Sequence, residues 1–232
     1  MNSKTKQIIE KNRQVYDRIA EPFAQSRKFL WADLKPLVVY TAEGDKVLDL
    51  GCGTGRLYQL FQDIQDVEYI GLDQSEGQIK VAQKNYSEAK FVVGEMTELP
   101  FGDNEFAVVY CVATFHHLPD EETRLQALQE MKRVLKLEGT LVMTNWNLLG
   151  RWGEGKVKRK EYKDLGKGDF IVPWKDKAGN ILGERYYHGF GLEELEDLFK
   201  KAGFELEEQY FAKHSQKTDK DQGENIISIA KM

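Results

Sequence analysis

The sequence has few cysteines and no excess of positive charge. Only Cys52 and Cys111 occur among the 232 residues, and neither lies in a Cys-x-x-Cys or zinc-ligand spacing. We therefore expect no disulfide and no metal site, and we interpret both as small buried residues. The net charge of −5 excludes a general affinity for nucleic acid, so any site for a polyanion has to be a local cationic patch.

Long apolar runs are also absent. The longest run, around residues 106–115, is far shorter than a membrane span, and the first residues contain no apolar core of the signal-peptide type. We expect no membrane partner and a cytoplasmic location. The apolar fraction of 41% and the charged fraction of 31% are typical of a globular protein, and the length suits a single domain over residues 1–232.

A glycine-rich turn follows the first predicted strand, residues 47–50. Gly51, Gly53 and Gly55 permit positive φ angles and let a ligand lie against the backbone. Arg56 occupies the place of the last glycine in Gly-x-Gly-x-x-Gly, so the dinucleotide fingerprint is incomplete. Asp49 would repel a pyrophosphate, and it suits a ligand that carries an ammonium and a sulfonium. The turn is predicted to lead into a helix with residues 57, 60, 61 and 64 buried.

Strands and helices alternate after this turn, as in a parallel sheet with crossover helices. Strands are predicted at residues 67–73, 91–93, 106–112 and 140–144, with helices at 75–86 and from 119–122 to 136–139. Asp73 ends the second strand, 22 positions past Gly51. An acidic side chain at this place accepts hydrogen bonds from ribose hydroxyls, so Asp73 is the candidate ribose ligand. A further helix at 192–203 and two closing strands, 204–211 and 226–230, complete the pattern.

Two helices, about 4–20 and 27–40, are expected before the first strand, as a helical cap over residues 1–44. The first should end before Pro22. These helices either pack on the sheet or fold over a ligand, and both interpretations stay open for Tyr16 and Trp31. Arg27 favours a ligand role, because a cation beside two aromatic residues can hold a carboxylate.

Residues 146–190 break the alternation. Within residues 151–177, nine Lys or Arg stand against five Asp or Glu, a local charge of +4. A long irregular insertion above the carboxyl ends of strands usually recognises the substrate, and a solvated loop is the alternative. For the run Lys158-Arg159-Lys160 alone, the solvated loop is favoured. The pair His116 and His117 lacks a third metal ligand, so His116 either orients a substrate or shapes its loop.

The Asp-x-Gly-x-Gly-x-Gly turn resembles that of S-adenosylmethionine (SAM) dependent methyltransferases with a Rossmann-like fold. Over roughly residues 16–204, the order and spacing resemble the tRNA wobble-uridine methyltransferases that esterify 5-carboxymethyluridine. The segments that carry this resemblance are 16–20, Phe23, 26–27, Trp31, 115–118, Val172-Pro173-Trp174 and Arg185-Tyr186-Tyr187-His188. It implies an α/β fold with seven strands in a mostly parallel sheet, a C-terminal antiparallel hairpin and helices on both faces.

The resemblance also implies the site. Its expected cofactor contacts are Tyr16, Arg27, Trp31, Asp49, Gly51, Gly53, Gly55, Asp73, Gln74, Glu95, Met96 and Val112. A carboxylate with a pKa of about 4 is ionised at neutral pH, so its methylation needs positioning but no general base. We expect Arg185, Tyr187 and His188 to hold the carboxymethyl group. Trp174 would stack on the base, and the other expected substrate contacts are His116, Arg151, Lys158, Arg159, Lys160 and Tyr186.

tRNA is therefore the expected partner. The eukaryotic members of this family work with a small zinc-binding activator protein, which is a second candidate partner. Two other interpretations compete: methylation of a small molecule by the same SAM site, and a non-catalytic tRNA- or protein-binding module of the same fold. The intact Asp49, glycine turn and Asp73 argue against the module, because a scaffold would not need to retain them.

Overall fold

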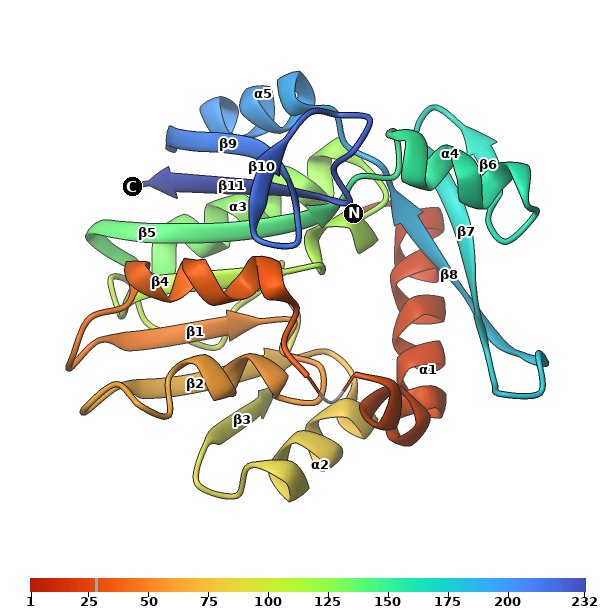
Figure 1. The fold of residues 1–232 in the computed structure, drawn as a ribbon. Coiled ribbons are helices and arrows are strands. Elements are labelled where there is room, and N and C mark those ends of the chain that lie inside the picture. Colours follow the sequence, from red (N-terminus) through yellow and green to blue (C-terminus); the bar gives the residue numbers. More distant parts are fainter. Residues whose placement is uncertain (28) are drawn as a thin grey trace.

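A large, mostly parallel β-sheet forms the centre of the molecule (Figure 1). This computed structural model describes residues 1–27 and 29–232. The sheet order is β10-β9-β11-β5-β4-β1-β2-β3. The bounds are β1 (Lys46–Leu50), β2 (Glu68–Asp73), β3 (Lys90–Val93), β4 (Phe106–Val112), β5 (Leu135–Trp146), β9 (Glu205–Lys213), β10 (Gln216–Thr218) and β11 (Asn225–Lys231).

The expected fold class is confirmed, with one strand more than the expected seven. Strands β3, β2, β1, β4 and β5 pair in parallel, and β11 pairs antiparallel with both β5 and β9. The additional strand is β10, which forms a hairpin on the edge strand β9 through His214 and Ser215, both at positive φ. An edge strand of polar residues has no apolar alternation, so the sequence pattern does not reveal it.

Helices cover both faces of the sheet (Figure 1). The covering helices include α2 (Glu76–Asn85), α3 (Glu121–Val134), α5 (Leu192–Ala202) and the 3₁₀ helix η1 (Ala32–Tyr40). The other helices near the strand ends are α1 (Ser3–Ser26) and the short 3₁₀ helices η2 (Arg56–Leu60) and η3 (Phe115–His117). Buried side chains form one large cluster on each face. One includes Leu48, Leu128 and Phe199, and the other includes Val47, Ile79 and Tyr110.

Three helix predictions were wrong in detail. The first helix continues through Pro22 to Ser26, because contacts with α2 and β8 override the local cost of proline. The helix expected at 27–40 is instead the 3₁₀ helix η1, which contains Pro36 and so lacks one of the donors that an α-helix needs. The helix after the glycine turn is only the short η2, and no residue in the sequence signals its early end.

The insertion expected to be irregular is folded, so that prediction was wrong. It contains α4 (Arg151–Lys158) and a three-stranded antiparallel sheet of β6 (Lys163–Gly166), β7 (Asp169–Lys175) and β8 (Ile181–His188). Phe170, Val172 and Tyr187 pack with Leu148 in a small core of this region. The alternation of apolar residues is short here, and glycine turns interrupt it, which hides the strands in the sequence.

Helix α1 crosses beyond the carboxyl ends of the parallel strands and contacts both α2 and β8 (Figure 1). The Asp17 carboxylate accepts hydrogen bonds from Ser75 Oγ (2.7 Å) and the Gly77 amide (3.0 Å). On the other side, Gly183 of β8 lies so close to Val15 that a Cβ atom would be 2.5 Å from Val15 Cγ1. Helix α1 thus connects the large sheet to the small one. The roles of residues 1–44 as a cap and of 146–190 as a recognition insertion stay predictions.

Candidate active site

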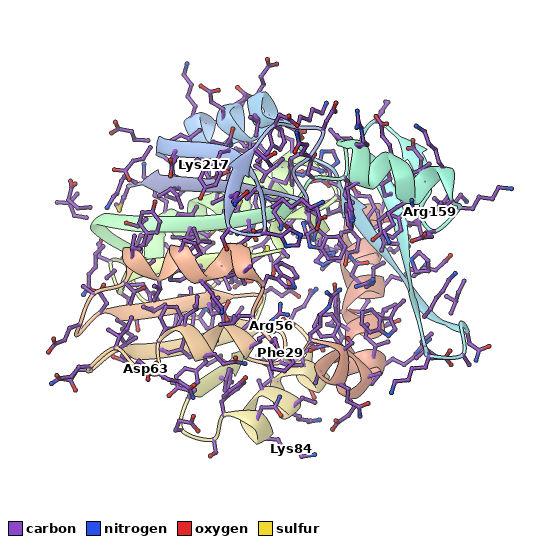
Figure 2. All side chains as sticks on the ribbon, in the orientation of Figure 1. Phe29, Arg56, Asp63, Lys84, Arg159 and Lys217 are labelled. Atoms are coloured by element: carbon purple, nitrogen blue, oxygen red, sulfur yellow. The ribbon has the colours of Figure 1, made fainter. Side chains whose placement is uncertain are left out.

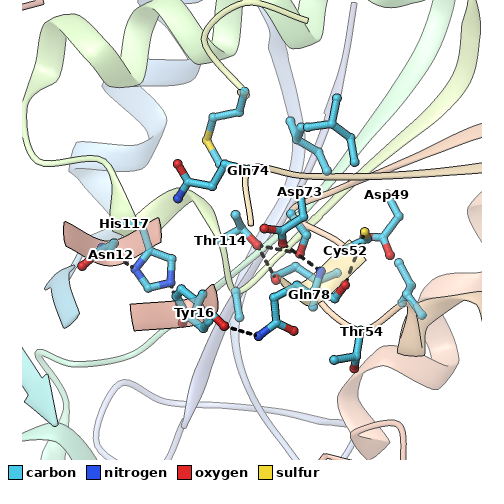
Figure 3. Close-up of a pocket in the computed structure, with 18 of the residues that line it drawn as sticks. Asn12, Tyr16, Asp49, Cys52, Thr54, Asp73, Gln74, Gln78, Thr114 and His117 are labelled. Carbon is cyan, nitrogen blue, oxygen red and sulfur yellow. Dashed lines mark hydrogen bonds between the residues drawn. The ribbon is translucent and has the colours of Figure 1, made fainter. Parts of the chain in front are cut away.

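A cavity lies at the carboxyl ends of β1, β2 and β4, closed on one side by α1 (Figure 3). Except for Gly55, which lies in the turn itself, the expected cofactor contacts all line this cavity. They are Tyr16, Arg27, Trp31, Asp49, Gly51, Gly53, Asp73, Gln74, Glu95, Met96 and Val112. The structure thus brings these residues together, and their individual roles stay predictions.

The glycine turn leaves room at the floor of the cavity. Gly51, Gly53 and Gly55 have φ angles of 77°, 53° and 78°. A Cβ atom on Gly51 would lie 2.2 Å from Thr114 Cγ2, whereas one on Gly53 would meet nothing closer than 3.7 Å. Gly53 is therefore needed for its backbone angle and for the open space above it, which is what a ligand lying on the backbone requires.

Two acidic side chains flank this turn (Figure 3). Asp73 accepts hydrogen bonds from the amides of Gly53 and Ser75, both at 2.9 Å, and burial raises its pKa to about 6. Asp49 is 1% exposed and accepts a hydrogen bond from Tyr69 OH at 2.7 Å. Burial raises the pKa of Asp49 to about 7. An ammonium or a sulfonium in the cavity would stabilise the ionised form of Asp49.

A buried arginine marks the other side of the cavity. Arg185 is 3% exposed, and its guanidinium carbon lies 5.2–5.4 Å from the ring centres of Tyr16, Trp174 and Tyr187. Its Nη1 donates to Tyr16 OH at 3.1 Å, and its Nε has no hydrogen-bond partner among residues 1–27 and 29–232. No carboxylate of the described residues pairs with it. The arrangement therefore favours an anionic ligand at Arg185.

His117 belongs to the same network, and sequence reasoning assigns it no role beyond its place in the histidine pair. Tyr16 OH lies 3.0 Å from its Nε2, and the Tyr186 carbonyl lies 3.0 Å from its Nδ1. Because a carbonyl only accepts, Nδ1 carries the proton, and Nε2 accepts from Tyr16 OH. Burial lowers the pKa of His117 to about 3, so the ring is neutral. Asn12 fixes the adjacent backbone through bonds to the amide and carbonyl of Tyr186.

The alternation of strand β8 separates the four residues expected to act together. Arg185 and Tyr187 line the cavity, whereas Tyr186 and His188 point to the opposite face. There, Tyr186 OH donates to Asp169 (2.6 Å), and the His188 ring lies between Asp169 (2.7 Å) and Glu194 (2.9 Å). The structure thus does not bring Tyr186 or His188 to the cavity, and the two-residue period of a strand was the signal that distinguishes them.

The remaining expected substrate contacts lie outside the cavity lining. His116 is fully buried and stacks on Tyr187 at 4.7 Å, and Trp174 lies under Arg185. On α4 and beside it, Arg151 pairs with Asp221, Lys158 with Glu154 and Arg159 with Glu161. Figure 2 shows Arg159 on the outer side of α4, far from Arg56 at the cavity. Lys160 forms no ion pair with any described residue.

No three His, Cys, Asp or Glu side chains gather as metal ligands in residues 1–27 and 29–232. No helix of the same residues is long and apolar enough to cross a membrane. The donor set of the cavity fits an adenosine with a cationic tail: a carboxylate at a strand end for the ribose, an open glycine floor, and a buried carboxylate for the positive charge.

Comparisons with known proteins agree with this geometry. Residues 48–143 match the family described as a methyltransferase domain. The "tRNA (carboxymethyluridine(34)-5-O)-methyltransferase" of Schizosaccharomyces pombe is 31% identical over 208 residues, which cover 82% of this chain and 86% of that protein. The "Demethylmenaquinone methyltransferase" of Thermotoga maritima is 31% identical over 62% of this chain and 63% of that protein.

A solved structure shares the fold. It is titled a complex between the Haloferax volcanii Trm112 methyltransferase activator and the putative methyltransferase, with a TM-score of 0.68, 20% identity and coverage of 95% of this chain and 96% of that one. The fold, the cavity and the similarity to the S. pombe enzyme lead to one assignment. The chain is an enzyme that uses S-adenosylmethionine as its cofactor, and it belongs to the methyltransferase family of the tRNA carboxymethyluridine methyltransferases.

Proposed function

We propose that this methyltransferase esterifies the carboxylate of 5-carboxymethyluridine, or a closely related modified uridine, at the wobble position of tRNA. The observation that carries the proposal is Arg185, a buried guanidinium that lines the cavity and pairs with no carboxylate in the described part of the chain. The similarity to the S. pombe enzyme supports the same substrate class.

The surroundings of Arg185 suit a carboxylate attached to a flat base. Burying a cation is costly unless an anion pairs with it. The described residues contact this guanidinium with three aromatic faces and one hydroxyl, and with no carboxylate. The unused Nε, together with the remaining N–H groups, can donate to both oxygens of a carboxylate. Trp174 supplies an aromatic face beside the same guanidinium, on which a base can stack.

The chemistry needs placement rather than proton transfer. S-Adenosylmethionine supplies an electrophilic methyl group when it is bound. Arg185 would hold the substrate carboxylate so that one of its oxygens could take this methyl group, with the electron pair of the broken carbon–sulfur bond left on sulfur. The products are a methyl ester and S-adenosylhomocysteine, and no proton moves. This agrees with a neutral His117 that is already bonded to Tyr16 and Tyr186.

The small sheet carries the cations that we propose for the RNA backbone. Arg185 pairs in register with Val172, in the middle of β7. Four exposed lysines lie beside this strand, and none of them forms an ion pair with a described residue. Lys163 of β6 lies opposite Ile171, Lys167 precedes the strand, and Lys175 and Lys177 lie at its other end. By contrast, Arg151, Lys158 and Arg159 are paired with acids. Phosphates on either side of a bound nucleotide would meet the unpaired lysines.

The direct test is mass spectrometry of nucleosides from tRNA that carries 5-carboxymethyluridine, after incubation with the enzyme and methyl-labelled SAM. We expect label in a carboxymethyl ester. Arg185→Gln should lower the rate at least about 100-fold, since a charged hydrogen-bond pair is lost at the reacting group, while binding of S-adenosylhomocysteine persists. Full activity of Arg185→Gln, or label on another nucleoside, would contradict the proposal.

A small-molecule substrate is the second candidate, favoured by the similarity to the T. maritima demethylmenaquinone methyltransferase. Under this alternative, labelled SAM gives no labelled tRNA, and tRNA does not compete with the small substrate. The interpretation as a binding module without turnover is set aside, because the chain belongs to a family of enzymes.

A small zinc-binding activator protein is a further proposed partner. It is supported by the H. volcanii methyltransferase of similar fold, whose structure is a complex with the Trm112 methyltransferase activator. Co-expression with such a protein should raise the specific activity or the melting temperature, and unchanged values for both would count against the partner. The cytoplasmic location stays part of this proposal.

A further inference from the structure

Two arginines share one wall of the cofactor cavity. Arg27 caps the C-terminal end of α1, and Arg56 follows Gly55 as the first residue of η2. Both line the cavity. Their guanidinium carbons lie 5.9 Å and 4.9 Å from the ring centre of Trp31, so a single indole supports both cations.

The positive charge of this wall is not balanced by carboxylates of the described residues. Neither arginine forms an ion pair within 4 Å of a described carboxylate. Arg56 donates from Nη1 to the Phe29 carbonyl at 3.2 Å, which leaves most of its five N–H groups available. Burial, followed by repulsion from Arg27, lowers the pKa of Arg56 to about 10. Two neighbouring cations on a half-buried wall are favourable only when an anion joins them.

The cofactor brings such an anion into this cavity. With its adenosine at the carboxylate of Asp73, as we expect, its amino-acid part would bring an ammonium and a carboxylate to the rest of the cavity. Asp49, next to the glycine turn, suits the positive part. We propose that Arg56 and Arg27 together bind the α-carboxylate of S-adenosylmethionine, with Trp31 holding the two guanidinium groups in place. An arginine thus stands where a dinucleotide-binding turn has its last glycine.

The test compares two ligands that differ in the amino-acid part. S-Adenosylhomocysteine has the α-carboxylate, and 5′-methylthioadenosine lacks it. We expect Arg56→Gln to weaken binding of S-adenosylhomocysteine about 10- to 100-fold in titration calorimetry, because a charge-assisted pair of hydrogen bonds is lost. Binding of 5′-methylthioadenosine should change less than about twofold, since it does not reach this wall. Arg27→Gln should show the same selectivity.

Lys217→Gln is the matched control, because it removes one positive charge from an exposed lysine that pairs with Glu208 on another part of the molecule (Figure 2). It should leave both affinities unchanged. Arg56→Lys keeps the charge but not the planar fork, and we expect an intermediate loss for S-adenosylhomocysteine alone.

Two results would overturn the proposal. Equal weakening of both ligands would mean that Arg56 only shapes the turn, and unchanged binding of S-adenosylhomocysteine would place its carboxylate elsewhere. If Arg56→Gln fails to fold, the ratio of the two affinities in Arg56→Lys decides: an unchanged ratio refutes the role. No RNA enters the experiment, so its outcome is independent of the proposed tRNA substrate, and a carboxylate of the substrate cannot account for the effect.

Discussion

We predict that Asp49 makes cofactor affinity depend on pH. Burial raises its pKa to about 7. If Asp49 meets the ammonium of the cofactor, as we predict, binding favours the ionised carboxylate. The pKa therefore falls on binding, and a proton is released below pH 7. We expect affinity for S-adenosylhomocysteine to be constant above pH 7 to 8 and to fall by up to about tenfold per unit between pH 7 and 6. Asp73, with a pKa of about 6, acts in the same direction below pH 6.

Titration calorimetry at pH 8, 7 and 6 measures this dependence. Asp49→Asn serves as the control, because its amide does not titrate: it should bind more weakly at pH 8 but show little change between pH 8 and 6.5. The same pH dependence in Asp49→Asn and in the native enzyme would assign the proton to another group.

Single residues were predictable where a motif fixes their backbone. The glycine turn predicts the position of Gly53, and the end of strand β2 predicts that of Asp73. Neither prediction depends on the rest of the fold. Arg56 and His117 were not predicted as site residues, although both line the cavity. Their spacing in the sequence does not show where the long side chain of Arg56 points or which atoms the ring nitrogens of His117 contact. Arg185 and Tyr187 were expected together with His188, and only the alternation of β8 separates them.

At the scale of elements, β8 is held by the residues that face away from the cavity. His188 bonds to Asp169 on β7 and to Glu194 on α5, and Glu194 also pairs with Arg124 of α3 at 3.2 Å. This network fixes the strand that carries Arg185. We interpret His188 as a residue that positions β8, in place of the catalytic role expected from the sequence.

His188→Leu should therefore act on stability first. The variant keeps the volume of the side chain but leaves two partly buried carboxylates without their partner, so we expect the free energy of unfolding to fall by about 1–3 kcal/mol in urea denaturation. Glu196→Gln on the exposed side of α5 is the control and should change it by less than about 0.5 kcal/mol. S-Adenosylhomocysteine affinity should remain within a few-fold of the native value. A stable His188→Leu variant that binds the ligand normally but has no activity would restore the catalytic role.

The elements differ in how far the sequence predicts them. Strand β4 is a continuous apolar run and was predicted to its ends, since a central parallel strand is buried on both faces. The small sheet was missed, because β6 is wholly exposed and β7 buries only Phe170 and Val172. Helix α1 continues past Pro22 because its contacts with α2 and β8 outweigh the local cost of a proline inside a helix. The sequence shows the proline but not these contacts.

At the scale of the whole molecule, the charge distribution matters more than the total. The net charge is −5, yet the segment 151–177 carries +4. The structure divides this local charge further: Arg151, Lys158 and Arg159 pair with acids, whereas the lysines beside β7 form no ion pair with any residue that the structure describes. We therefore predict that the proposed tRNA substrate meets the unpaired lysines of the small sheet rather than the acidic remainder of the protein.

The double substitution Lys175→Glu and Lys177→Glu tests this distribution. We expect kcat/KM for tRNA to fall at least about tenfold at low salt, and the slope of log affinity against log salt to decrease by about 1.4–1.8, because about two phosphate contacts are lost. S-Adenosylhomocysteine affinity should not change. The matched control, Lys213→Glu with Lys217→Glu, makes the same change in net charge at lysines that pair with Glu224 and Glu208. If both double variants lose the same affinity, long-range charge rather than contact at the small sheet binds the RNA. If neither loses any, the phosphates lie elsewhere, and the location of the basic surface has to be sought outside β7 and β8.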